Sequence, residues 1–206
     1  MQTIALIGKS GTGKSHKAQK VARENETQFI IDDGLFICGI QVAAGRSAKR
    51  ESTKLSAIRR AIFQDPDHAA EVKEQIRTAS PDKILILGTS EGMVEAICQA
   101  LELPMPTKNI YIEEVSTDPE IDTAQRSRKI EGKHVIPVPT LEIKKDFSGF
   151  LLDPLKIFYK RGKRTEIVEE KSVMRPTYSY MGKYTISDTT VTQIIVYSAQ
   201  QVPGIG

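Results

Sequence analysis

The chain has 206 residues, of which 39% are hydrophobic and 27% are charged, so a packed core is possible and wholesale disorder is excluded. Its 14 glycines and 10 prolines follow no period, which excludes collagen-like and low-complexity chains. No apolar run approaches the roughly 18 residues of a membrane helix, and the N-terminus lacks the basic region of a secretory signal. Because two cysteines cannot build a disulfide framework, we expect a soluble, cytoplasmic protein.

The net charge of +3 is distributed unevenly along the chain. Residues 1–139 carry 19 basic and 19 acidic side chains, whereas residues 140–206 carry 10 and 7. This change in composition near Pro137 and Pro139 predicts a nucleotide-binding domain over 1–139 and an extension over 140–206.

Apolar patterns in the first part predict alternating strands and helices. Strands are expected at 3–7, 29–31, 84–87, 110–112 and 135–136. Helices are expected from Lys14, around 55–62 with Leu55, Ile58 and Ile62 on the buried side, around 72–76, after a Ser90 cap, and between Asp118 and Gly132. This alternation predicts an α/β fold with a parallel sheet that helices cover on both faces.

The extension is expected to be rich in β-structure. Segments 155–159 and 165–168 flank the charged turn 161–164, a pattern typical of a β-hairpin, and further strands are expected at 173–180 and 183–186. Residues 182–205 resemble the opening of the bacterial alkaline-shock protein domain. Because a lone hairpin is marginally stable in water, we expect the extension to be a contact surface for a second copy or a protein partner, outside the catalytic core.

One glycine-rich segment carries the strongest chemical signal. It lies between the first strand and the first helix, and it fits the pattern G-x-x-x-x-G-K-[ST]. Glycines allow backbone N–H groups to surround an anion, and the helix N-terminus adds its positive dipole end. We expect Lys14 to reach the β- and γ-phosphates of ATP, and the Ser15 hydroxyl to bind Mg²⁺. The residues expected to contact the nucleotide are Gly8, Lys9, Ser10, Gly11, Thr12, Gly13, Lys14, Ser15 and His16.

Residues 3–33 resemble the start of P-loop kinases and ATPases. The form G-x-x-G-x-G-K-S is similar to shikimate kinase, and it also resembles HPr kinase, in which the next strand ends in an Asp pair as at Asp32 and Asp33. At His16 the HPr kinase pattern has Glu instead. The resemblance implies a P-loop NTPase sheet and ATP- and Mg²⁺-dependent phosphoryl transfer.

Asp32 and Asp33 are the first candidates for the catalytic acid. They end a strand that we expect to neighbour the loop-bearing strand, where they could hold Mg²⁺ or orient an acceptor hydroxyl. Alternatively, Asp-Asp-Gly is only a turn. Since the strand at 84–87 ends without an acid, Glu113 and Glu114 are the alternatives.

Two groups of cations are also candidates. Arg126 and Arg128 lie on a predicted helix with few apolar residues, which would suit a lid that stabilises charge on the phosphates; an exposed, salt-bridged helix is the alternative. Six cations between residues 46 and 60 could clamp an anionic acceptor, or could form a solvated helix face. Nucleic-acid binding by this stretch is disfavoured, because no aromatic residues are interleaved with the cations.

These features together predict an ATP-binding, Mg²⁺-dependent kinase that transfers the γ-phosphate to an unidentified small molecule or protein. The alternative is a nucleotide-switched ATPase or regulator that acts on a partner bound by the extension. A kinase requires an acceptor pocket beside the γ-phosphate, whereas a switch requires only a segment that senses that phosphate.

Overall fold

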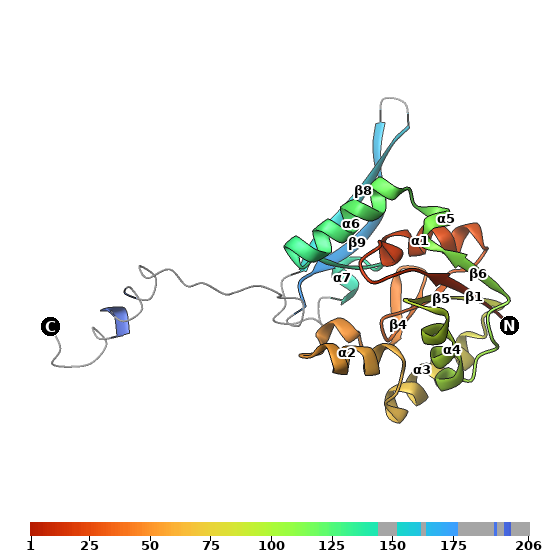
Figure 1. Cartoon of the computed structure of the whole chain (residues 1–206). Coiled ribbons are helices and arrows are strands. Elements are labelled where there is room, and N and C mark those ends of the chain that lie inside the picture. The colour runs from red at the N-terminus through yellow and green to blue at the C-terminus, as the bar shows by residue number, and fades with distance from the viewer. Residues whose placement is uncertain (144–151, 162–163, 177–191, 193–195, 199–206) are drawn as a thin grey trace.

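The computed structural model describes residues 1–143, 152–161, 164–176, 192 and 196–198 (Figure 1). Its main sheet has six strands in the order β4-β3-β2-β5-β1-β6. Strands β2, β5, β1 and β6 are parallel, whereas β3 pairs antiparallel with β2, and β4 pairs antiparallel with β3. The strand bounds are β1 Gln2–Ile7, β2 Phe29–Asp32, β3 Leu35–Cys38, β4 Gln41–Gly45, β5 Lys83–Gly88 and β6 Lys108–Tyr111.

Helices begin and end at ordinary capping signals. The Ser90 hydroxyl accepts a hydrogen bond from the Met93 N–H at 3.2 Å, and Gly132 ends α6 in the left-handed region, as expected. Asp65 caps α3 with its side chain, although the sequence analysis did not single it out. The helices are α1 Lys14–Glu24, the 3₁₀ turn η1 Ala48–Arg50, α2 Lys54–Ala61, α3 Pro66–Ala79, α4 Glu91–Leu101, α5 Ile112–Val115, α6 Asp118–Glu131 and α7 Thr140–Ile143.

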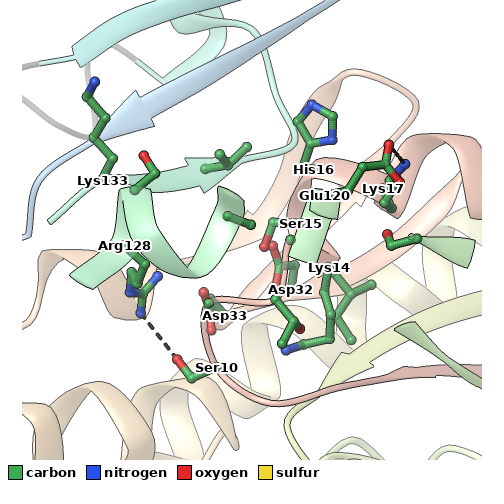
Figure 2. A pocket seen from close by; sticks show the side chains of 18 of the residues that line it. Ser10, Lys14, Ser15, His16, Lys17, Asp32, Asp33, Glu120, Arg128 and Lys133 are labelled. Atoms are coloured by element: carbon green, nitrogen blue, oxygen red, sulfur yellow. Dashed lines mark hydrogen bonds and ion pairs between the residues drawn. The ribbon is translucent and has the colours of Figure 1, made fainter. Parts of the chain in front are cut away.

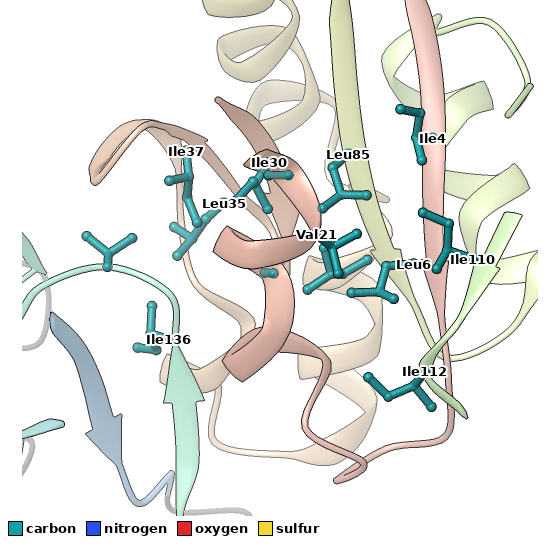
Figure 3. Close-up of a cluster of buried hydrophobic side chains, with 14 of the residues drawn as sticks. Ile4, Leu6, Val21, Ile30, Leu35, Ile37, Leu85, Ile110, Ile112 and Ile136 are labelled. Atoms are coloured by element: carbon teal, nitrogen blue, oxygen red, sulfur yellow. The ribbon is translucent and has the colours of Figure 1, made fainter. Parts of the chain in front are cut away.

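Helices cover the main sheet on both faces, which confirms the α/β class and the mostly parallel sheet. On one face, Val21 of α1 packs against Leu6, Ile30 and Leu85 in a cluster shown in Figure 3. On the other face, α3 and α4 pack their buried side chains against Ile86 and its neighbours. Alternate residues of β1 and β5 enter opposite clusters, as the two-residue period of a strand requires.

Two expectations about the main sheet were wrong, and one hairpin was missed. Strand β2 does not neighbour β1, because β5 lies between them and pairs with both. Ile112 does not end a strand but begins α5 and is buried under it. The hairpin of β3 and β4 was not expected at all, although Leu35–Cys38 is an apolar run that pairs in register with β2.

Helix α2 buries a different face from the one expected. Ala57 and Ala61 are buried, whereas Leu55 and Ile58 are 58% and 57% exposed. The small alanine side chains let α2 approach η1 closely, and this contact turns the larger apolar side chains outward.

A second sheet of three antiparallel strands has the order β7-β9-β8, with bounds β7 His134–Ile136, β8 Leu152–Arg161 and β9 Arg164–Met174. The expected hairpin is therefore confirmed, and its strands are longer than expected. β7 was expected to complete the parallel sheet, but it pairs with β9 instead. Turn residues 162–163, the strand expected at 183–186, the second half of 173–180 and most of the resemblance at 182–205 lie outside the described residues.

The second sheet shares a core with the main domain. Ile136, Ile143 and Met174 belong to the same buried cluster as Val21 and Leu6. Side chains on both sides of the expected boundary at residue 139 therefore pack together, and the division into 1–139 and 140–206 stays a prediction from composition.

Candidate functional site

The loop between β1 and α1 has the backbone of an anion-binding turn. Gly11 and Gly13 have φ values of 83° and 92°, a region that side chains other than glycine rarely enter. The Thr12 hydroxyl donates to the Lys9 carbonyl at 2.7 Å and fixes the turn. Because α1 begins immediately afterwards, its unpaired N–H groups and positive dipole end meet at this loop.

The Lys14 side chain lies across its own loop. Its ammonium donates to the carbonyl oxygen of Gly8 and, at 3.0 Å, to that of Lys9. Burial lowers the pKa of Lys14, while the negative charges of Asp32 and Asp33 oppose this effect. The ammonium is therefore held close to the position that an anion on the loop would occupy.

Asp32 is a buried carboxyl with spare hydrogen-bonding capacity. It is 5% exposed, and its Oδ2 atom has no hydrogen-bond partner among the described residues. Burial raises its pKa to about 6, against the attraction of Lys49 and a hydrogen bond from the Ser15 hydroxyl. A buried polar atom without a partner carries a desolvation cost that a ligand can relieve.

Asp33 forms an ion pair with Lys49, a side chain that is only 1% exposed. The Ala48 N–H donates to the Asp33 carbonyl at 2.8 Å, so η1 and the end of β2 are joined by backbone as well as by charge. Burial alone would raise the pKa of Asp33, but the charge and hydrogen bond of Lys49, together with the charges of Arg128 and Lys14, outweigh burial and lower the pKa. Asp33 therefore stays ionised where Asp32 is poised to bind a proton.

Lys49 is a residue of this site that the sequence did not single out. It lay within the run of cations at 46–60, but nothing distinguished it, because the β3–β4 hairpin that returns it to Asp33 was not predicted. The other cations of the run lie elsewhere. Arg60 pairs with Glu51 at 2.9 Å and with Asp65 at 3.1 Å, and Arg46 and Arg50 line a separate cavity of about 220 Å³.

Helix α6 covers the loop and separates the two expected lid residues. Arg128 packs its stem against Gly11 and extends toward the loop, with its guanidinium 3.5 Å from the Ser10 hydroxyl (Figure 2). Arg126 is exposed and is not among the described residues that line the cavity. An ion pair of 2.7 Å between Lys17 and Glu120 ties α6 to α1.

These groups share one cavity of about 810 Å³. The loop from Ser10 to Lys17, including His16, lines it together with Asp32, Asp33, Lys49 and Arg128, whereas Gly8 and Lys9 are not among its described lining residues. The alternative acids also lie elsewhere, and Glu114 instead accepts from the Tyr111 N–H at 2.7 Å at the start of α5.

The extension contributes to this cavity as well. Pro154, Leu155 and Val173 of the second sheet are among the lining residues. The expectation that the extension lies outside the site is therefore wrong. It rested on the basic excess after residue 139, on the hairpin pattern and on the resemblance at 182–205, none of which says how β9 packs.

The donor set suits Mg²⁺ better than a metal held by protein alone. Among the described residues, no group of three or more His, Cys, Asp or Glu side chains gathers as a metal site. Mg²⁺ typically takes one or two protein oxygens and completes its shell with water and phosphate. The Ser15 hydroxyl and the spare Asp32 oxygen fit this requirement.

No helix in the described part of the chain is both long enough and apolar enough to cross a membrane. Comparison with models of protein families, with curated proteins and with solved structures finds no match to this chain.

Proposed function

We propose that this chain is a P-loop protein that binds Mg²⁺-ATP and transfers the γ-phosphate to an acceptor. One observation carries the proposal: the loop with its two left-handed glycines opens into the same cavity as Lys14, Asp32 and the Asp33–Lys49 pair. An anion-binding turn without a ligand would not require Lys14, Lys49 and Arg128 to gather around it with two carboxyl groups.

Both backbone and side-chain groups of the site would contact Mg²⁺-ATP. Backbone N–H groups of the loop would hold the α- and β-phosphates, and Lys14 would exchange its two carbonyl partners for phosphate oxygens. Ser15 and Asp32 would hold Mg²⁺, which neutralises charge on the phosphates when bound. Arg128 lies above Gly11, where a cation can stabilise charge that develops during transfer.

Asp33 is suited to orient the attacking group. In transfer to a hydroxyl, the acceptor oxygen forms a bond to the γ-phosphorus, the bond to the β-phosphate oxygen breaks, and the acceptor proton passes to a carboxylate. Because the transition state is loose, positioning matters more than a strong base. Lys49 keeps Asp33 ionised and fixed in place, so its carboxylate can accept a hydrogen bond from the acceptor.

Calorimetric titration of ATP tests the proposal. Lys14→Ala should weaken binding by about ten- to a hundredfold, since a hydrogen bond to a charged group contributes roughly 1.5–3 kcal/mol. Lys20→Ala is the matched control, because Lys20 lies on the same helix but is exposed and pairs only weakly with Glu24, at 3.7 Å. Equal affinity of the wild type and Lys14→Ala would refute phosphate binding by the loop.

One contact supports a nucleotide switch as the second candidate. The buried Lys171 of β9 donates to the carbonyl of His16, in the first turn of α1. A displacement of this turn would therefore be transmitted to the second sheet through this hydrogen bond. Hydrogen exchange of β9 with ADP and with a non-hydrolysable ATP analogue separates the two candidates: a switch requires different protection in β9, whereas a kinase does not.

A further inference from the structure

The face that the second sheet turns toward the loop carries three aliphatic side chains beside the buried Lys171. Val135 and Val173 are directly paired across β7 and β9, so they lie on the same face of the sheet. Leu155 pairs with Lys171, two residues before Val173, and therefore shares that face too. All three apolar side chains line the 810 Å³ cavity and are partly exposed.

The opposite face of this sheet is already occupied. Ile136 and Met174 are buried in the core cluster beneath α1, and Ser172 donates to the Val138 carbonyl at 2.7 Å. The sheet therefore uses one face for stability, while the other borders the cavity with aliphatic side chains. Exposed aliphatic groups in a cavity favour an apolar ligand surface.

The apolar wall lies at a defined end of the phosphate site. Lys14, Asp32, Asp33 and Lys49 mark the end at which the γ-phosphate would lie, because the loop lysine reaches the β- and γ-phosphates. Figure 2 shows the Lys14 and His16 side chains extending to opposite sides of the helix N-terminus, and Lys171 of β9 donates to the His16 carbonyl. A polyphosphate bound along the loop with its last phosphate at Lys14 would therefore extend toward the second sheet.

The wall is held firmly in relation to α1. Lys171 donates to the His16 carbonyl, and the Gln19 amide donates to the carbonyl of Pro137 at 3.0 Å, immediately after β7. Because these bonds join the second sheet to the helix that begins the phosphate site, the distance between phosphate and wall is set by the fold. A preformed distance favours one ligand length over others.

We propose that Val135, Leu155 and Val173 form the subsite for the nucleobase, so that the second sheet holds the base while the loop holds the phosphates. This inference rests on the proposed function. Flat apolar faces of a nucleobase match aliphatic side chains on a sheet, whereas a phosphoryl acceptor has to meet the γ-phosphate at the other end of the cavity.

Titration of ATP and of inorganic tripolyphosphate against the same variants tests the subsite. Val173→Asn and Leu155→Ala should each weaken ATP binding about tenfold, which corresponds to about 1.4 kcal/mol, and leave tripolyphosphate affinity unchanged. Val42→Asn is the matched control, because Val42 is also a half-buried strand valine but lines the separate 220 Å³ cavity. Thermal melts of each variant establish that it is folded at the temperature of the titration.

Three outcomes would overturn the subsite. If both variants fold and bind ATP as the wild type does, the base lies elsewhere. If ATP and tripolyphosphate affinity fall together, the substitutions act on the loop and not on the base. If wild-type protein binds neither ligand, the proposed function itself fails, and this result is distinct from the other two.

Discussion

The burial of His134 predicts how the free energy of unfolding changes with pH, and the size of this change follows from the pKa of His134. This side chain is 1% exposed in β7, and burial, followed by the charges of Arg128 and Lys49, lowers its pKa from 6.5 to about 2, although Asp33 opposes the shift. Below pH 6.5 the unfolded chain therefore binds a proton at this position that the folded chain does not bind. Stability from His134 is complete above pH 6.5 and is lost as the pH falls toward 2.

The expected loss follows from the unfolded-state titration. Between pH 7 and pH 5, protonation of His134 in the unfolded chain alone lowers the free energy of unfolding by about 2 kcal/mol. Asp32 acts in the opposite direction, because its pKa is raised to about 6 and the folded chain binds the extra proton. Over the same range Asp32 contributes about 1 kcal/mol of added stability, which offsets part of the loss from His134.

Comparison with His134→Gln separates the two groups. Urea unfolding at pH 7 and pH 5 gives the free-energy difference between wild type and variant, in which the Asp32 contribution largely cancels. We expect the wild type to lose about 2 kcal/mol relative to His134→Gln between these pH values. A difference that does not change with pH would show that His134 titrates normally in the folded chain and would refute the reasoning.

Three further predictions concern catalysis, the loop and the shared core. Asp33→Asn should lower the rate of phosphoryl transfer or ATP hydrolysis by about a hundredfold or more and change ATP affinity much less, measured by phosphate release and titration. Gly11→Ala should cost about 1–2 kcal/mol of unfolding free energy because of its φ of 83°, whereas Gly92→Ala, in open space on α4, should stabilise by up to about 1 kcal/mol. Met174→Ala should destabilise the whole chain by about 2–5 kcal/mol in a single unfolding transition, against less than about 0.5 kcal/mol for the exposed Ile130→Ala; two separate transitions would indicate an independent extension.

Local sequence patterns predicted correctly those elements that short-range interactions define without contacts from distant parts of the chain. The strand at 84–87, the Ser90 cap and the Gly132 stop follow from short-range sterics and hydrogen bonding, and the structure confirms them. Pairing between strands was predicted poorly, because β5 takes its place between β1 and β2 through contacts far apart in the sequence. Likewise, no local sequence signal indicates that the strand containing Ile136 pairs with β9 and not with the main sheet.

In the candidate site, too, the features set by local sequence could be predicted, and those set by long-range contacts could not. The loop could be found from sequence, since its glycines and Lys14 lie in one short segment with the spacing of the P-loop pattern. Lys49 could not be distinguished from its charged neighbours, because its role depends on burial against Asp33. Leu155 and Val173 looked like ordinary strand residues, and only the register of the second sheet places them on the face toward the cavity.

Because β5 lies between β1 and β2, these two strands cannot become part of one sheet until residue 88 has left the ribosome. At about 5–20 residues per second, synthesis of residues 33–82 takes roughly 3–10 s, longer than local hairpins need to form. During this time β1 and the β2–β3–β4 hairpins each present an open strand edge to the other and to other chains. The yield of folded protein in a cell therefore depends on the interval before Lys83–Gly88 arrives, and slowing translation within residues 33–82 should increase aggregation.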